Sequence, residues 1–269
     1  MREKEILLIS ELDNKARRNI SLNSLFSREK FENIPIIISH DANAGALADW
    51  WFDIEKIDLK GVVVHFLVGE GVGAGVINNG VVFTGSCGVA AEIGHVSIDH
   101  EGPLCVCGNN GCLEMYCSSL AFIRYAEEHR RTNKNSKLNN EIRLSADLIF
   151  SLAKEGDEIA MECVKNAAYF IALGCVNIIN CYNPDTIIIC NEMAKGGAML
   201  LEIVKENVKK RVLSTLYEKV DIVISSFKGD DILFGAAAVA IDYCLKRPNI
   251  LKKTTIFGEK SYAKNIEAI

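Results

Sequence analysis

Three cysteines and one histidine cluster in a glycine-rich stretch, and this cluster constrains the fold more than any other feature of the sequence. His95 is followed, after nine residues, by the run Cys105-Val-Cys107-Gly-Asn-Asn-Gly-Cys112. Reduced core thiols beside a surface histidine are the alternative interpretation, but a run rich in glycine and asparagine is not typical of a core. Three thiolates and an imidazole match the four ligands of a closed tetrahedral zinc site, and glycines permit the tight turn it needs. We therefore predict a structural zinc ion held by His95, Cys105, Cys107 and Cys112, with no coordination position left for catalysis.

Composition limits the class of protein. The chain has 269 residues, 49% of them hydrophobic, and a formal net charge of −5, which is the balance of a globular protein with a sizeable core. An acidic chain does not attract nucleic acid or an anionic membrane as a whole. No apolar run approaches the ~20 residues of a membrane span, and the N-terminus lacks the long apolar region of a secretory signal. We therefore expect a cytoplasmic protein without a membrane partner.

The pattern of apolar residues predicts an α/β fold. Three apolar runs at residues 61–68, 71–77 and 80–85 are separated by glycines and predict consecutive antiparallel strands. A helix is expected from Asp41, and a long, largely buried helix over residues 157–182. The strands predicted at residues 185–190 and 220–226 alternate with helices, which indicates a mixed sheet covered by helices.

Four segments resemble, in the right order, the successive motifs of the ROK family of repressors, open reading frames and sugar kinases. They are HDANAGALADWWF from His40, VGEGVGAGVINNG from Val68, EIGHVSID from Glu92 and GPLCVCGNNGCLEMYCSS from Gly102. The resemblance implies a ribonuclease H-like, actin-like ATPase fold whose two lobes enclose a sugar. It also implies a domain division: residues 1–60 as the remnant of an incomplete first lobe, 61–247 as the second lobe with the zinc motif, and 248–269 as a peripheral tail.

The resemblance also implies a set of sugar-binding residues. Asp41 corresponds to the carboxylate that meets a sugar hydroxyl, and in the family's kinases this carboxylate is the general base. Its alternative role is a plain helix N-cap. Glu92 and His95 are similar to residues that bind other ring hydroxyls, so His95 would offer one nitrogen to zinc and the other to the sugar. Glu114 resembles a further sugar-binding carboxylate, and its alternative role is an ordinary glutamate at a helix start.

The resemblance is weaker in the segments that bind the nucleotide in the family's kinases. Phosphoryl transfer needs donors and cations around the nucleotide phosphates and magnesium. The family's glycine-rich phosphate loop is matched by Gly69, Gly71 and Gly73, although a lone glycine motif is also typical of a hairpin corner. Glu70 stands in this loop where kinases carry a hydroxyl, and a carboxylate repels phosphate. The glycines that follow the strand DTIIIC in family kinases are replaced by Asn191–Ala194, and the Asp-x-Gly-Gly-Thr pattern of family N-termini is absent from this sequence.

The sugar side also departs from the family at two positions. His40 replaces the usual asparagine, and Ala91 replaces a glycine that commonly precedes the E-x-G-H motif. The predicted sugar-binding residues are nevertheless present, whereas the departures on the nucleotide side are more severe. This asymmetry resembles the repressor branch of the family (NagC/XylR type), whose core senses a sugar and need not phosphorylate it.

The favoured function is therefore a sugar-sensing regulatory core that binds a hexose or N-acetylhexosamine beside zinc and forms a homodimer. An active sugar kinase that uses Mg-ATP and Asp41 as general base is the alternative. A remnant that folds and binds zinc without a sugar response is the third interpretation. No recognition helix with basic flanks is visible, so we do not expect DNA binding by this chain alone.

Overall fold

The computed structural model describes residues 5–6, 20–21, 37–52, 61–227 and 231–246. One compact unit runs from Ser39 to Ala238, and it contains all the predicted site residues. A second unit comprises residues 1–38 and 239–269, and its described strands β1 (Glu5–Ile6) and β2 (Ile20–Ser21) pair antiparallel. The division between residues 60 and 61 predicted from the family resemblance stays a prediction.

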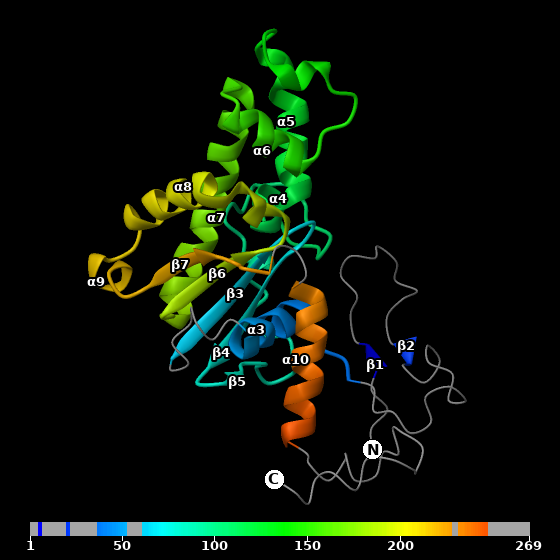
Figure 1. Cartoon of the computed structure of the whole chain (residues 1–269), viewed down its shortest axis with the longest axis vertical. Helices are drawn as coiled ribbons and strands as arrows, with labels where there is room; N and C mark the ends of the chain where they lie inside the picture. The colour runs from blue at the N-terminus through cyan, green and yellow to red at the C-terminus, as the bar shows by residue number, and fades with distance from the viewer. Residues whose placement is uncertain (1–4, 7–19, 22–36, 53–60, 228–230, 247–269) are drawn as a thin grey trace, which may run out of the picture. The chain divides into compact units, whose positions relative to one another are not determined.

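The centre of the larger unit is a mixed five-stranded sheet with the order β5-β4-β3-β6-β7 (Figure 1). Its strands are β3 (Val62–Val68), β4 (Val72–Asn78), β5 (Val81–Val82), β6 (Thr186–Cys190) and β7 (Asp221–Ile224). The first three strands form the predicted antiparallel succession, and β6 and β7 join β3 by parallel pairing. The parallel connections run through helices, as parallel pairing requires.

Helices account for most of the remaining described residues of this unit. The described α-helices are α3 (Asp41–Phe52), α4 (Glu114–Cys117), α5 (Ser119–His129), α6 (Ala146–Lys154), α7 (Glu158–Tyr182), α8 (Gly197–Lys209), α9 (Ser214–Tyr217) and α10 (Asp231–Lys246), of which α10 belongs to the second unit from Val239 onward. Short 3₁₀ turns lie at η2 (Ile93–His95), η3 (Arg130–Thr132), η4 (Lys137–Asn140) and η5 (Glu192–Gly196). The helices expected at Asp41 and over residues 157–182 therefore form, with Asp157 as the N-cap of the second.

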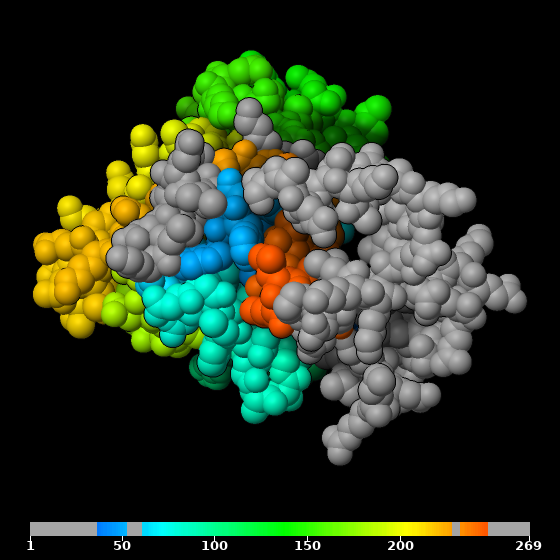
Figure 2. Space-filling model, turned by 60° about the horizontal axis from the view of Figure 1, so that its bottom comes forward, coloured from blue at the N-terminus to red at the C-terminus, as the bar shows by residue number. Residues whose placement is uncertain are grey.

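The two faces of the sheet are covered differently. On one face, Val64, Phe66 and Val68 of β3 belong to a large apolar core that includes much of α7. On the other face, Leu67 packs with Ala42 of α3, so α3, blue in Figures 1 and 2, lies against the cyan strands β3 and β4. Alternate side chains of one strand thus serve two layers, as the pleat of a strand requires.

The helix α7 is long and apolar enough to cross a membrane by length and composition alone. In the structure, however, 56% of its most apolar window is buried inside the protein. It packs against α6 and α8 and contributes Ile171, Ile178 and Ile179 to the large core. The helix is therefore accounted for as the central core helix of this unit.

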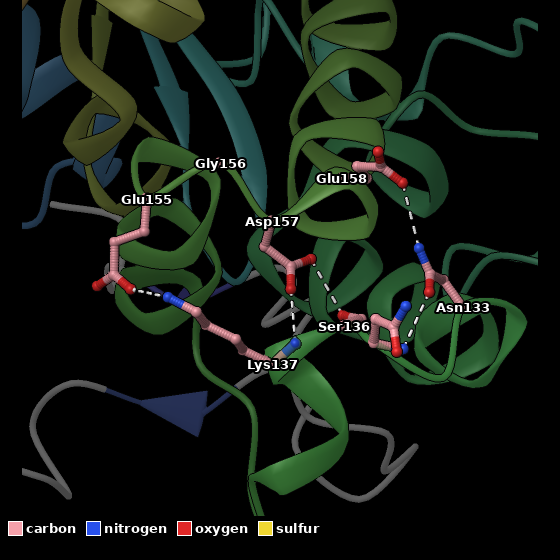
Figure 3. A pocket seen from close by; sticks show the side chains of 8 residues that line it. Asn133, Ser136, Lys137, Glu155, Gly156, Asp157 and Glu158 are labelled. Carbon is pink, nitrogen blue, oxygen red and sulfur yellow. Dashed lines mark hydrogen bonds and ion pairs between the residues drawn. The ribbon is translucent and has the colours of Figure 1, made fainter.

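A polar pocket of about 280 Å³ lies at the N-terminus of α7, between the loop that carries Ser136 and the end of α6 (Figure 3). Asp157 at its centre accepts hydrogen bonds from the Ser136 hydroxyl and from the backbone N–H groups of Lys137 and Ala160. Burial raises the pKa of Asp157, but these donors outweigh it and hold the pKa below its usual value. The pocket therefore lies where the N-cap of α7 meets the loop that carries Ser136, and the hydrogen-bonding capacity of its central carboxylate is satisfied.

Replacing Asp157 with alanine is expected to lower the free energy of unfolding by about 2 kcal/mol, because a lost N-cap costs ~1 kcal/mol and the Ser136 hydroxyl also loses its partner. The contribution of the charge depends on pH. Because the folded pKa lies below the unfolded value near 3.8, the stabilisation is complete above that pH and is lost as pH falls through the folded pKa. Urea unfolding at several pH values measures both effects.

Asp157→Asn isolates the part of the stabilisation that depends on the charge of Asp157, because asparagine keeps an acceptor oxygen. Its stability difference from the wild type should shrink as pH falls below about 4. Asp147→Asn, at a carboxylate that is 64% exposed and paired with Lys195 on the surface, is the control and should change stability by less than about 0.5 kcal/mol. A difference for Asp157→Asn that is the same at low and neutral pH would contradict this assignment.

Candidate functional site

The predicted metal ligands converge on one point. The ligand atoms of His95, Cys105, Cys107 and Cys112 all lie within 4.8 Å of one another. Cys107 Sγ and Cys112 Sγ are 3.6 Å apart, and Cys105 Sγ is 3.6 Å from His95 Nδ1. Bonds of ~2.3 Å to sulfur and ~2.0 Å to nitrogen would place tetrahedral ligands ~3.5–3.8 Å apart. The donor set and its spacing therefore fit a tetrahedral metal ion, with Nδ1 as the nitrogen turned toward it.

The loop that carries these ligands is shaped by short backbone contacts. Isolated bridges pair Ser97 with Cys112 and Leu104 with Asn110. Gly111 has φ +64°, and a Cβ there would lie 1.6 Å from the carbonyl oxygen of Asp99, so only glycine fits this turn. The local sequence thus folds the chain back on itself and brings Cys112 to the other ligands.

The thiols differ in their ease of ionisation. Burial raises the pKa of Cys105. Burial and the neighbouring thiols together raise the pKa of Cys112 to about 12. Burial also acts upward on Cys107, but hydrogen bonding from the Asn109 N–H and the other thiols outweighs it and lowers the pKa of Cys107. A bound divalent cation would supply the positive charge that three adjacent thiolates need.

The predicted sugar-binding residues gather around the start of β4. Glu114 accepts a hydrogen bond from the Val72 N–H at 2.9 Å. The turn η2, which carries His95 and follows Glu92, packs so closely that a Cβ at Gly94 would lie 2.0 Å from the Val72 carbonyl oxygen. The start of β4 therefore packs against Glu114 and against η2, the turn that carries His95 and follows Glu92.

Asp41 and Glu92 are linked by a residue that the sequence had marked only as a departure. His40 Nδ1 lies 3.5 Å from Asp41 Oδ1, and His40 Nε2 lies 3.8 Å from Glu92 Oε1. The imidazole lies over Gly73, where a Cβ would be 3.6 Å from its Cε1 atom. The side chains of His40, Asp41 and Glu92 are 39–51% exposed, so their polar atoms can be reached by a ligand. These residues and Glu114 offer the several acceptors that a polyhydroxylated ligand requires.

The predicted phosphate loop is tied to its neighbours. Gly69 donates its N–H to the Gly71 carbonyl at 2.9 Å and accepts from the Ser119 N–H at 2.7 Å. The Ser119 hydroxyl donates to the Glu192 carboxylate at 2.6 Å. The third predicted glycine, Gly73, lies instead in β4 beneath His40. This corner thus carries a carboxylate where a nucleotide site needs cations and open N–H donors.

The comparisons with known proteins support the same family. The ROK family model matches residues 3–243. The chain belongs to the ROK family.

Two curated relatives illustrate the range of proteins that the chain resembles. The xylose repressor of Caldicellulosiruptor bescii is 30% identical over 91% of this chain and 61% of its own length. The glucokinase of Halalkalibacterium halodurans is 31% identical over 75% of this chain and 62% of its own length. The chain thus spans about three-fifths of the length of these relatives.

A solved structure agrees with the fold expected for the ROK family. A ROK family transcriptional regulator, described as a homologue of the Escherichia coli Mlc protein, superposes with a TM-score of 0.76 at 26% identity. The superposition covers 88% of this chain and 59% of that one. The predicted actin-like ATPase fold, with a mixed sheet covered by helices, is confirmed.

Two positions at which the family resemblance predicts a glycine have a backbone conformation that favours glycine. Ala91 has φ +68°, and Asn191 has φ +69° with ψ −153°, a conformation used almost only by glycine. Both turns therefore carry a residue that adopts this backbone conformation only with strain.

Restoring glycine at one of these turns should stabilise the protein. Ala91→Gly is expected to raise the free energy of unfolding by about 0.5 kcal/mol, because relief of the left-handed conformation, worth about 1–2 kcal/mol, outweighs the loss of one methyl group from the large apolar core, worth about 0.8 kcal/mol. Ala90→Gly is the matched control, since Ala90 does not have a positive φ and glycine there should be neutral or destabilising. Thermal denaturation measures both variants, and a destabilised Ala91→Gly beside a neutral Ala90→Gly would contradict the strain.

Proposed function

We propose that this chain is the sugar-sensing core of a ROK-family transcriptional repressor and that it binds a monosaccharide beside a structural zinc ion. The observation that carries the proposal is the contrast between two sets of residues in one unit. Around the start of β4, Glu92, His95 and Glu114 provide acceptors for sugar hydroxyls, with Asp41 joined to Glu92 through His40. At the corner that carries the predicted phosphate loop, the Glu192 carboxylate accepts a hydrogen bond from the Ser119 hydroxyl.

The chemistry of each set supports this division of roles. Carboxylates in a sugar site each accept two hydroxyl donors and so discriminate against analogues that lack one. Carboxylates beside a triphosphate are unfavourable unless cations neutralise them. The four relatives named as xylose or putative xylose repressors, at 30–32% identity, point the same way.

The zinc ion would be held by His95, Cys105, Cys107 and Cys112. When bound, it would supply structural cross-linking of the loop and not catalysis, because four protein ligands leave no open position. With Nδ1 of His95 turned toward the metal, Nε2 is the nitrogen left for the sugar. In this arrangement the metal centre fixes the ring that reads the ligand.

A sugar kinase is the second candidate. It is favoured by the glucokinase relative at 31% identity and by the exposed Asp41 carboxylate at the first residue of α3, where a general base would stand. In that role Asp41 would accept the proton of the phosphorylated hydroxyl, and Mg-ATP would be the phosphoryl donor.

Calorimetric titration with xylose, glucose and N-acetylglucosamine, with and without Mg-ATP, separates the candidates when ADP formation is followed in parallel. We expect micromolar to millimolar binding of one sugar without ADP formation. Sugar-dependent ADP release would establish the kinase instead, and the absence of binding by every sugar would contradict both candidates.

The assembly and location of the chain are part of the same proposal. We place the protein in the cytoplasm as a homo-oligomer, because the curated relatives are repressors and sugar kinases. DNA binding is not assigned to this chain, which covers only part of the repressors' length. Size-exclusion chromatography with light scattering tests the oligomer, and a monomer at micromolar concentration would contradict it.

A further inference from the structure

A line of polar side chains crosses the otherwise apolar contact between α3 and the sheet. Asp49 of α3 places Oδ2 2.5 Å from Nδ1 of His65 on β3. The other ring nitrogen, Nε2, lies 2.8 Å from Sγ of Cys190 at the end of β6. All three residues have a relative exposure of 0%. Neither the proposed sugar site nor the metal centre uses any of them.

The hydrogen bonds of this line are consistent with one another. Cys190 donates its thiol proton to the Phe66 carbonyl oxygen at 3.2 Å. The Cys190 sulfur and His65 Nε2 share a second hydrogen bond, and His65 Nδ1 shares a third with the Asp49 carboxylate. A buried ionisable pair is costly when one partner is removed, because the other is left uncompensated in an apolar layer. The three side chains therefore behave as one unit.

The surrounding packing leaves α3 little freedom to shift. A Cβ at Gly45 of α3 would lie 2.3 Å from His65 Nε2, and a Cβ at Gly75 of β4 would lie 2.1 Å from the Ala42 carbonyl oxygen. Both glycines thus allow the helix backbone to rest directly on the sheet. Because protein interiors are close-packed, a slide of α3 along the sheet would break the line at Asp49.

The two ends of the line reach the two halves of the candidate site. Helix α3 begins at Asp41, one of the proposed sugar residues. Strand β6 ends at Cys190, and the next residue, Asn191, lies in the strained turn with its side chain against Gly69. The line is therefore a physical connection between the sugar-bearing helix and the turn on the nucleotide side.

We propose that Asp49, His65 and Cys190 form a positioning relay that fixes the seating of α3, and with it the placement of Asp41, and that couples this seating to the turn after β6. The coupling is a property of the ligand-free chain. Its consequence for sugar affinity rests on the proposed function.

Amide hydrogen exchange of the ligand-free, full chain tests the coupling at a distance. Cys190→Ala, which removes only the sulfur from β6, should speed exchange of the amides of residues 44–48 in α3 by at least tenfold. Asp49→Asn, in α3, should speed exchange at residues 192–194 after β6 by a comparable factor. Cys175→Ala is the matched control, since Cys175 is another fully buried thiol but lies on α7. It should leave both segments within twofold of the wild type.

The proposal would be overturned if residues 44–48 in Cys190→Ala and residues 192–194 in Asp49→Asn both exchanged at the wild-type rate. An equal acceleration by Cys175→Ala would also overturn it. If Asp49→Asn does not fold, Cys190→Ala decides alone. Titration of the same variants with the sugar that the wild type binds adds a second readout, in which Cys190→Ala should weaken binding at least tenfold and Cys175→Ala should not. A wild type that binds no sugar would contradict the proposed function, and the exchange data would still decide the relay.

Discussion

Replacing Cys107 with serine is expected to abolish stoichiometric zinc binding and to lower the free energy of unfolding by at least about 3 kcal/mol, in the upper range for single substitutions. The loop is held by backbone contacts that include two isolated bridges, and its side chains Leu104 and Val106 are 71% and 68% exposed. The loop leaves these two apolar side chains exposed, so a bound metal ion would supply much of its cross-linking.

Metal analysis of the purified protein, followed by thermal denaturation, measures both effects. Cys87→Ser is the matched control, because Cys87 is an exposed free cysteine outside the ligand set, and this variant should keep one equivalent of zinc and wild-type stability. A full equivalent of zinc in Cys107→Ser would show that Cys107 is not a ligand. Zinc loss in both variants would point to a general effect of cysteine replacement.

Glu92→Gln is expected to weaken sugar binding by ten- to a hundredfold while the zinc content stays at the wild-type level. The loss of one hydrogen bond to a charged acceptor costs ~1.5–3 kcal/mol, and each 1.4 kcal/mol is a factor of ten in affinity. Glutamine keeps the size of the side chain, so the change reports on the acceptor and its charge.

Calorimetry with the sugar that the wild type binds measures the affinity. Glu101→Gln is the control, because the Glu101 side chain is 85% exposed and lies beside the exposed His100, and it should bind like the wild type. Unchanged affinity in Glu92→Gln would exclude the carboxylate from the site. Lost zinc in the same variant would instead mean that the substitution disturbs η2, which carries His95.

Much of the candidate site could be predicted because its chemistry is local in sequence. The four candidate metal ligands lie between residues 95 and 112, where a glycine turn and short backbone contacts bring them together, and the structure places their ligand atoms close to one another. The helix at Asp41 and the antiparallel strands β3 to β5 also follow from local periodicity and glycine breaks. The role of Glu114 in holding the Val72 N–H could not be predicted, because it joins residues 42 positions apart.

The sequence by itself determined the family, the α/β class and the cluster of candidate metal ligands, since each is encoded by residue types at short, fixed spacings. Only the tertiary structure decided that His40 lies between Asp41 and Glu92 and that Glu192 accepts a hydrogen bond from Ser119. It also decided that a line of buried polar side chains crosses from α3 to β6. This line joins His65 to Cys190 across 125 positions. Such contacts depend on strand order and on how closely a helix rests on a sheet, and glycines at the contact set that distance. Periodicity records which face of an element is buried, but it does not record which residue of a distant element meets it.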